Sequence, residues 1–274
     1  MPELPEVETV ARQLAPLLQG RRVRRVEILD PKLEIPNCAA ACCAAAGRVM
    51  GKISRLGKQV VIELRDPARK RKTLWLAVHL RMTGRLAWTP RTDPAQERHL
   101  RARLTLDKGY LLFRDARRFG TMRLVGSIDC LYPAGLDPMG QDFTRGALAG
   151  LLAGSRQEIK PWLLRQDRLV GVGNIYAAEI LFTARLDPFR MAESLGPAEA
   201  RRLHGAVRRV LQRGIAHGGT TFSDFQDANG NSGRFQKLLA VYGRAGKPCK
   251  RCGAPIERAV QQGRGTFFCS HCQG

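Results

Sequence analysis

No run of apolar residues in this sequence approaches the about 20 that a membrane-spanning helix needs. The apolar core of a secretory signal peptide is missing as well. Both absences argue against a membrane-embedded or exported protein. We therefore expect a soluble, cytoplasmic protein with no membrane partner.

Acidic residues are scarce relative to basic ones. The chain has 24 Asp plus Glu against 46 Lys plus Arg, which gives a net charge of +22, and the bases are spread along its whole length. Such a field favours a polyanionic partner, such as a nucleic acid. With 274 residues, 44% of them hydrophobic, the chain can also bury a core.

Cysteines with the spacing of metal ligands occur only near the C-terminus. Two CxxC pairs, separated by residues 253–268, contain Cys249, Cys252, Cys269 and Cys272. Paired thiolates on two tight turns can meet in a tetrahedron around zinc. Because four thiolates close the coordination sphere and leave no position for water or substrate, we expect one zinc ion with a structural role. We expect no organic cofactor. The zinc would present Arg264 to a phosphate; alternatively, Arg264 is a solvated turn residue.

The other cysteines are Cys38, Cys42, Cys43 and Cys130, in apolar or Ala-rich surroundings. They lack ligand spacing, so we expect buried small hydrophobic residues.

The first half of the chain changes from helical to β periodicity. Apolar residues at helical spacing predict a helix over 5–19, ended by Gly20. Short β-prone runs broken by Gly, Pro and Asp turns then predict an antiparallel sandwich, with strands at 23–28, 60–64, 74–80 and 110–113.

The second half is predominantly helical. A Pro- and Gly-rich linker at 132–139 leads to predicted helices at 143–152, 158–164, 174–183 and 197–216. The Gly- and Asn-rich segment 218–236 has little periodicity, which is typical of a functional loop.

The extreme N-terminus carries a candidate nucleophile. Pro2 becomes the terminal residue once Met1 is removed, and its secondary amine would stand beside Glu3 and Glu6. An α-amino group has a pKa of about 7.7–8.0, so a usable neutral fraction exists at physiological pH. Amines form Schiff bases with carbonyl-like carbons, and a neighbouring carboxyl can move the proton. The alternative is an acidic pair that only complements a helix dipole.

A weaker signal is Gly171-Val172-Gly173-Asn174 before a predicted helix. Glycines there would let the backbone approach a phosphate, and the helix N-terminus offers free N–H groups. No Lys follows these glycines as in a nucleotide phosphate loop. A helix-entry turn without a ligand is the alternative.

Several motifs together resemble the formamidopyrimidine-DNA glycosylase family. The N-terminal MPELPEVETV matches almost letter for letter, and the other motifs follow in order: Gly57-Lys58, His79-Leu80-Arg81-Met82-Thr83-Gly84, Asp115-Ala116-Arg117-Arg118-Phe119-Gly120, Gly171-Val172-Gly173-Asn174-Ile175-Tyr176, Gly218-Gly219-Thr220-Thr221 and Gly263-Arg264-Gly265-Thr266-Phe267-Phe268-Cys269. Leu4 resembles the purine-directed branch, because the related endonuclease VIII type typically has Gly there.

The resemblance implies a set of site residues. The catalytic ones are Pro2, Glu3, Lys58, Glu6 and Arg264, with Glu3 as general acid/base and Glu6 as a supporting carboxyl. The DNA-binding ones are His79, Met82, Arg117, Phe119, Lys160, Asn174, Thr220, Thr221 and Arg264. Segment 218–236 would cover the extruded base.

The resemblance assigns Met82, Arg117 and Phe119 to a wedge. An enzyme that extrudes a base from a duplex must fill the hole it leaves, and an apolar wedge with an arginine suits a minor-groove intercalator. From the strand pattern alone, sheet core is the better interpretation of Met82 and Phe119.

Two positions depart from the family pattern. Ala116 replaces a usual Pro, which predicts a less stiff loop. Arg165 stands where an Asp is expected, which puts the packing beneath Asn174 in doubt unless Asp167 compensates.

The resemblance implies an α+β multidomain protein: a β-sandwich catalytic domain with an N-terminal helix (1–135), a helical helix-two-turns-helix domain (136–238) and a four-cysteine zinc ribbon (239–274). We expect a monomeric base excision repair enzyme that removes oxidised purines from double-stranded DNA and cuts the strand by β,δ-elimination. The alternatives are an endonuclease VIII-like enzyme for oxidised pyrimidines and a non-catalytic damage-binding protein.

Overall fold

The computed structural model describes residues 1–33, 38–68, 73–90, 98–221 and 225–274. The contacts divide it into two compact units. The first contains residues 1–132 and 217–234, and the second contains 133–216 and 235–274. None of the helices in these described ranges combines the length and apolar character that crossing a membrane requires.

The first unit opens with helix α1, Leu4–Leu18, as the periodicity predicted. Glu3 and Glu6 form a capping box at its start, and Pro5 lies in its first turn, where its missing N–H costs nothing. Gly20 follows with a φ of +85°, a left-handed conformation that favours glycine. The buried face of α1 comprises Val7, Val10, Leu14 and Leu18.

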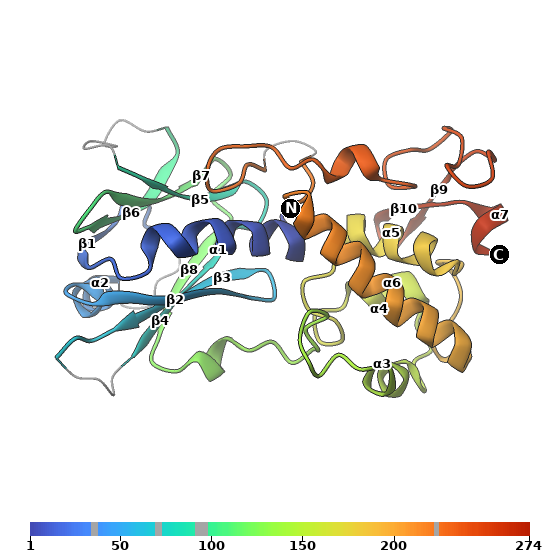
Figure 1. Ribbon diagram of the computed structural model, residues 1–274, viewed down its shortest axis with the longest axis horizontal. Coiled ribbons are helices and arrows are strands. Elements are labelled where there is room, and N and C mark those ends of the chain that lie inside the picture. The colour runs from blue at the N-terminus through green and yellow to red at the C-terminus, as the bar shows by residue number, and fades with distance from the viewer. Residues whose placement is uncertain (34–37, 69–72, 91–97, 222–224) are drawn as a thin grey trace. The chain divides into compact units, whose positions relative to one another are not determined.

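Two antiparallel four-stranded sheets make a sandwich, in the orders β1-β6-β7-β5 and β2-β3-β4-β8 (Figure 1). The strands are β1 (Val23–Ile28), β2 (Val49–Leu56), β3 (Gln59–Arg65), β4 (Leu74–His79), β5 (Gly84–Thr89), β6 (Leu100–Leu106), β7 (Tyr110–Asp115) and β8 (Thr121–Val125). The sequence predicted β1, β3, β4 and β7. It did not predict β2, β5, β6, β8 or the short helix α2 (Cys38–Ala45).

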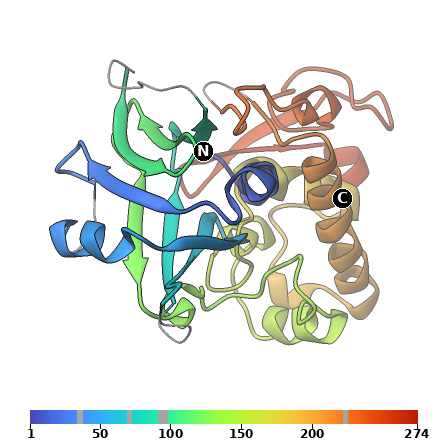
Figure 2. The ribbon, with the colours of Figure 1, turned by 60° about the vertical axis from the view of Figure 1, so that its left-hand side comes forward.

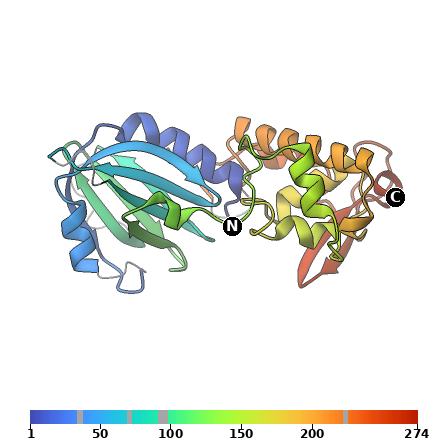
Figure 3. The ribbon, with the colours of Figure 1, turned by 90° about the horizontal axis from the view of Figure 1, so that it is seen from below.

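The core of this unit lies between α1 and the two sheets. Helix α1 packs against β2 and β3 of one sheet and β5 of the other, and Figure 3 shows it running along the strands. Buried side chains from both sheets meet it, including Ile62, Val78 and Phe113. This packing fixes the helix whose first turn carries Glu3 and Glu6.

The second unit is helical and ends in a small hairpin. Its helices are α3 (Arg145–Leu152), α4 (Ile159–Leu164), α5 (Asn174–Ala184) and α6 (Pro197–Ala216), and the sequence predicted all four. The long helix α6, orange in Figure 2, packs on α5. The hairpin pairs β9 (Glu257–Gln261) with β10 (Arg264–Phe268) and is followed by α7 (Ser270–Gln273).

Glu179 of α5 anchors the segment that leads into the hairpin. Its side chain is 4% exposed and accepts the backbone N–H groups of Ala240, Val241 and Tyr242. Burial raises the pKa of this carboxyl, and the three N–H donors oppose the shift.

The predicted helical domain ran to residue 238, and its boundary stays a prediction. By its contacts, segment 217–234 groups with the first unit. The physical reason is a set of contacts to α1. Thr220 donates to Glu6, Ala228 N–H donates to Gln13, and Gln13 donates to Asp227. Residues 222–224 of the predicted cover lie outside the described residues.

The expectation that the scattered cysteines are buried is wrong for two of them. Cys43 and Cys130 are exposed and Cys42 is intermediate, while the Cys38 side chain lies outside the described residues. The reason is that α2 and the short turn around Cys130 lie at the surface.

Candidate active site and nucleic-acid interface

The N-terminus is held at the start of α1. Pro2 and Glu3 are buried, while Met1 is 49% exposed. Glu3 N–H donates to Glu6 Oε2 at 2.7 Å, and the Glu3 carboxylate accepts the N–H of Glu6 in return. The acidic pair therefore does cap the helix, as the simpler interpretation proposed. The same contacts fix Glu3 directly beside Pro2.

Glu6 also holds the loop that follows α6. It is 1% exposed, and its Oε1 accepts the N–H of Thr220 at 2.7 Å and the hydroxyl at 3.1 Å. Gly219, with a φ of +79°, permits this approach, because a Cβ there would lie 2.5 Å from Glu6 Oε1. Within the loop, the Thr221 hydroxyl donates to Phe225 and accepts from Gly233 N–H. Glu6 thus joins α1 to the loop.

Lys58 and His79 come together at one end of the sheet β2-β3-β4-β8. Lys58 follows Gly57, whose φ of +57° suits a two-residue hairpin between β2 and β3. Gln59 pairs with His79 in the β3–β4 register. Burial, then the charges of Arg81 and Lys58, lower the pKa of His79 to about 4. His79 Nδ1 accepts Arg81 N–H at 3.1 Å, so the neutral imidazole carries its proton on Nε2.

Met82 lies in a tight turn between β4 and β5. Gly84 N–H donates to Leu80 at 2.9 Å, and a Cβ on Gly84 would lie 2.4 Å from that carbonyl oxygen. Glycine is therefore required here. The turn leaves Met82 40% exposed.

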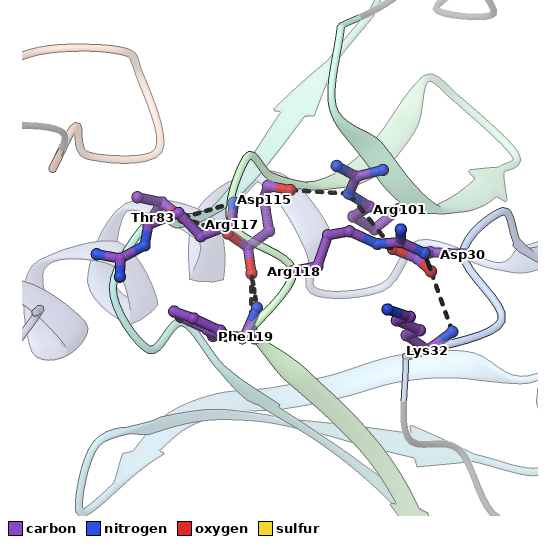
Figure 4. A network of polar contacts seen from close by, with 9 residues as sticks. Asp30, Lys32, Thr83, Arg101, Asp115, Arg117, Arg118 and Phe119 are labelled. Carbon is purple, nitrogen blue, oxygen red and sulfur yellow. Dashed lines mark hydrogen bonds and ion pairs between the residues drawn. The ribbon is translucent and has the colours of Figure 1, made fainter.

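Asp115 organises the loop that carries Arg117 and Phe119 (Figure 4). Its carboxylate is fully buried and accepts the backbone N–H groups of Arg117, Phe119 and Gly120 at 3.2, 2.9 and 2.6 Å. The Thr83 hydroxyl donates to it and accepts Arg117 N–H at 3.2 Å. One carboxylate therefore fixes this loop and links it to the turn after Met82.

Arg118 provides a second anchor for the same loop. Its φ of +61° turns the side chain toward Asp30, which is 3% exposed and accepts from its guanidinium in an ion pair (Figure 4). The hydrogen bond from Arg118 lowers the pKa of Asp30 to about 2. Side chains thus hold the backbone on both sides of Ala116. The less stiff loop expected from Ala116 stays a prediction.

Phe119 and Met82 are not sheet core. Phe119 is 51% exposed, and the Arg117 guanidinium stacks over its ring at 4.9 Å from the centroid. The core interpretation from the strand pattern is wrong for both residues, because they lie in turns where the strands end.

In the second unit, Asn174 and Lys160 meet at the hairpin that carries Arg264. Asn174 Nδ2 donates to the Gly265 carbonyl at 3.0 Å. Lys160 Nζ donates to the same carbonyl at 3.2 Å and to the Thr266 hydroxyl at 2.9 Å. Arg264 itself is exposed at the start of β10.

Lys160 is fully buried, and its burial, with the charge of Arg264 second, lowers its pKa to about 8. These contacts favour a positioning role for Lys160 beneath Arg264. Direct contact of Lys160 with DNA stays a prediction.

Arg165 finds a partner of opposite charge two residues along the chain. Its guanidinium pairs with Asp167 at the surface, as the sequence allowed. Gln166 instead fixes the turn, donating to Val172 and accepting Gly171 N–H, both at 2.9 Å.

The four C-terminal cysteines form a tight thiol cluster, and their ligand atoms all lie within 4.8 Å of one another. Cys249 and Cys269 are buried, and no His, Asp or Glu among the described residues completes the group. Four sulfurs at this separation fit a tetrahedral zinc ion with Zn–S bonds of about 2.3 Å. The cluster therefore fits the structural zinc that the spacing predicted.

Three family models match the chain in order. The formamidopyrimidine-DNA glycosylase N-terminal domain covers residues 1–122, the H2TH domain of the same enzyme covers 134–226, and a zinc finger found in FPG and IleRS covers 246–274. A formamidopyrimidine-DNA glycosylase of Symbiobacterium thermophilum is 44% identical over 280 residues, spanning 100% of this chain and 89% of the relative. The chain belongs to the formamidopyrimidine-DNA glycosylase family.

Solved structures agree with this glycosylase assignment. The crystal structure of MutM (Fpg) from Thermus thermophilus is 41% identical with a TM-score of 0.86, covering 99% of this chain and 98% of that one. A complex of the Lactococcus lactis Fpg with DNA containing an abasic site is 32% identical with a TM-score of 0.88, covering 99% of both chains. The resemblance and the fold class inferred from the sequence are thus confirmed.

The sequence did not reveal the part that Asp115 and Thr83 play in this glycosylase. Both residues stand in motifs that resemble the family, but the sequence analysis assigned neither of them a role. The available signal was Asp115 at the start of a turn that ends at Gly120. The short side chain of an Asp in such a turn often accepts hydrogen bonds from nearby backbone N–H groups. That signal does not identify Thr83, which is distant in sequence.

Proposed function

We propose that this glycosylase excises oxidised purines from duplex DNA and then cleaves the strand, with the amine of Pro2 as nucleophile. The observation that carries the proposal is the buried Pro2 beside the Glu3–Glu6 pair, which Thr220 joins to the loop after α6. The exposed Met1 side chain and the small Pro2 support removal of Met1. The Lactococcus lactis Fpg has been solved with DNA that contains an abasic site, and a mutant of it has been solved with DNA that contains Fapy-dG.

The chemistry follows from the amine. The Pro2 nitrogen attacks the sugar carbon that bears the damaged base, the glycosidic bond breaks, and the base leaves with a proton. The Pro2 nitrogen gives up its proton, the bond from the same carbon to the ring oxygen breaks, and the ring oxygen takes up a proton, which leaves an iminium. Its positive charge acidifies the neighbouring sugar protons. Loss of these protons expels first one and then the other flanking phosphate. Glu3 moves the protons, and Glu6 keeps Glu3 and the loop in place.

The remaining residues position the DNA. Lys58 and the Nε2–H of His79 would act on the lesion strand, and Asn174 and Arg264 would bind phosphate. Met82, Arg117 and Phe119 would fill the gap left by the extruded base. We propose that the enzyme works as a monomer on the DNA of the cytoplasm.

The test is cleavage of a duplex that contains 8-oxoguanine. We expect strand scission that leaves phosphates on both ends of a one-nucleotide gap, and no scission of the undamaged duplex. Binding without scission would instead identify a non-catalytic damage sensor on the same scaffold.

A second substrate class has one specific support. The Lactococcus lactis Fpg, 33% identical, has also been solved with DNA containing an oxidised pyrimidine. Competition between 8-oxoguanine and an oxidised pyrimidine in one assay ranks the two, and preferential cleavage of the pyrimidine would contradict the purine assignment.

Changing Thr83 to Val should slow cleavage of a paired lesion about 10-fold. The change keeps the shape but removes the hydroxyl that joins Asp115 to Arg117 N–H, a contact to a charged group worth about 1.5–3 kcal/mol. Cleavage of a preformed abasic site should change little, because no base must leave the stack. Single-turnover rates on both substrates measure the difference.

Thr83→Ser is the matched control, since it keeps the hydroxyl and should behave as the wild type. Equal losses on both substrates, or equal losses in the two variants, would show that Thr83 does not position the wedge.

A further inference from the structure

A basic pocket in the first unit borders the wedge loop, and Arg85, Arg98 and Arg114, which line it, have no part in the proposed reaction. It has a volume of ≈ 450 Å³, and four of its lining residues are arginines: Arg85, Arg98, Arg114 and Arg117. Gln226 of the segment after α6 also lines it. The pocket can hold a phosphate group with several waters, each of which takes about 30 Å³.

The fold forces two of these arginines together. Arg85 of β5 lies directly opposite Arg114 of β7 in the antiparallel register. Like charges directly opposite each other in a sheet are destabilising. Burial lowers the pKa of both guanidinium groups, and the charge of Arg85 lowers that of Arg114 further. The two arginines therefore repel each other at a position where neutral residues would make the folded protein more stable.

Two carboxylates near Arg85, those of Asp115 and Asp227, bind other groups. Both carboxylate oxygens of Asp115 accept hydrogen bonds, from the Thr83 hydroxyl and from backbone N–H groups of its own loop. Asp227 accepts the N–H groups of Asn229 and Asn231 on one oxygen and Gln13 on the other, so its charge only partly offsets the burial of Arg85. Among the described residues, the buried Arg85 Nε has no hydrogen-bond partner.

We propose that this pocket binds a phosphodiester group of the bound DNA, with Arg85 and Arg114 as its principal ligands. Paired guanidinium groups match the oxygens of a phosphate, and the phosphate supplies negative charge where the two arginines repel each other. Arg117 and Ala116 of the wedge loop form part of the same wall, so DNA that receives the wedge brings its backbone to this pocket. The inference rests on the proposed function, because it requires DNA at the wedge.

The test compares Arg85→Gln with Arg24→Gln, a control that removes the same charge from an exposed position on β1. In Arg85→Gln, we expect affinity for lesion DNA to fall about 10-fold. The slope of log affinity against log salt should become shallower by about 0.9, as for the loss of one phosphate contact. Arg24→Gln should keep the wild-type slope.

The free protein gives an independent readout. Since Arg85→Gln removes the repulsion between Arg85 and Arg114, its Tm without DNA should rise by about 1–3 °C. A merely structural arginine would give the opposite sign. A lowered Tm, or a salt slope equal to that of Arg24→Gln, would overturn the proposal.

Inorganic phosphate distinguishes the source of the ligand. If phosphate at constant ionic strength raises the Tm of the wild type but not of Arg85→Gln, while their DNA salt slopes agree, the pocket takes free phosphate and the DNA assignment is wrong. If the wild type itself fails to bind lesion DNA, the proposed function fails, and the Tm readout still reports on the pocket.

Discussion

Changing Cys249 to Ser should abolish zinc binding and weaken binding to lesion DNA by about 100-fold or more. Structural zinc contributes about 10–16 kcal/mol of apparent binding free energy in isolated fingers, so losing a ligand releases the turns that the metal holds. The hairpin that follows carries Arg264 and the Gly265 carbonyl bound by Asn174 and Lys160. The variant should lose the two phosphate contacts proposed for Asn174 and Arg264. At about 1.5–3 kcal/mol each, their loss accounts for the expected fall in affinity for DNA.

Elemental analysis and fluorescence anisotropy measure the two effects. Cys130→Ser is the matched control, because Cys130 is an exposed thiol outside the cluster and should leave one zinc per chain and wild-type affinity. Wild-type affinity after complete removal of the metal would show that the ribbon has no part in binding.

Changing Glu3 to Gln should reduce excision of 8-oxoguanine by about 10²- to 10⁴-fold, the usual contribution of a general acid or base. The amide oxygen can still accept the N–H of Glu6, so the start of α1 should survive. What the variant loses is the ability to give up and take a proton. Cleavage of a preformed abasic site should be reduced less, because no base must be released.

Glu8→Gln is a suitable control for this substitution. Glu8 lies on the same helix but pairs with Arg12 and Arg55, away from Pro2. It should keep wild-type excision. Normal excision by Glu3→Gln, as judged by single-turnover rates, would assign the proton transfer to another group.

The sequence predicted well what is encoded locally. Helix α6 and strand β1 have the predicted bounds, and the zinc cluster follows from the spacing of its cysteines. Strand β2 was missed because Gly51 and Lys52 interrupt its apolar pattern, and the structure has a register shift between Met50 and Ile53. Helix α2 was missed because its composition is apolar on every side and has no helical period.

The sequence could not predict contacts between distant segments. The bond between Glu6 and Thr220 spans 214 residues, so no local pattern could reveal it. The burial of Lys160 depends on a hairpin more than 100 residues away. The Arg85–Arg114 pair exists only once the register of β5 and β7 is known.

Borohydride trapping on lesion DNA tests the central claim, that Pro2 is the nucleophile, most directly. The reagent reduces the iminium to a stable amine, so protein whose Met1 has been removed should become covalently joined to the DNA, and mass spectrometry should locate the bond at Pro2. Protein with a blocked terminus, through a retained Met1 or an added tag, should bind the DNA but form no adduct. An adduct at Lys58, or one that persists in protein with Met1 in place, would contradict the N-terminal mechanism.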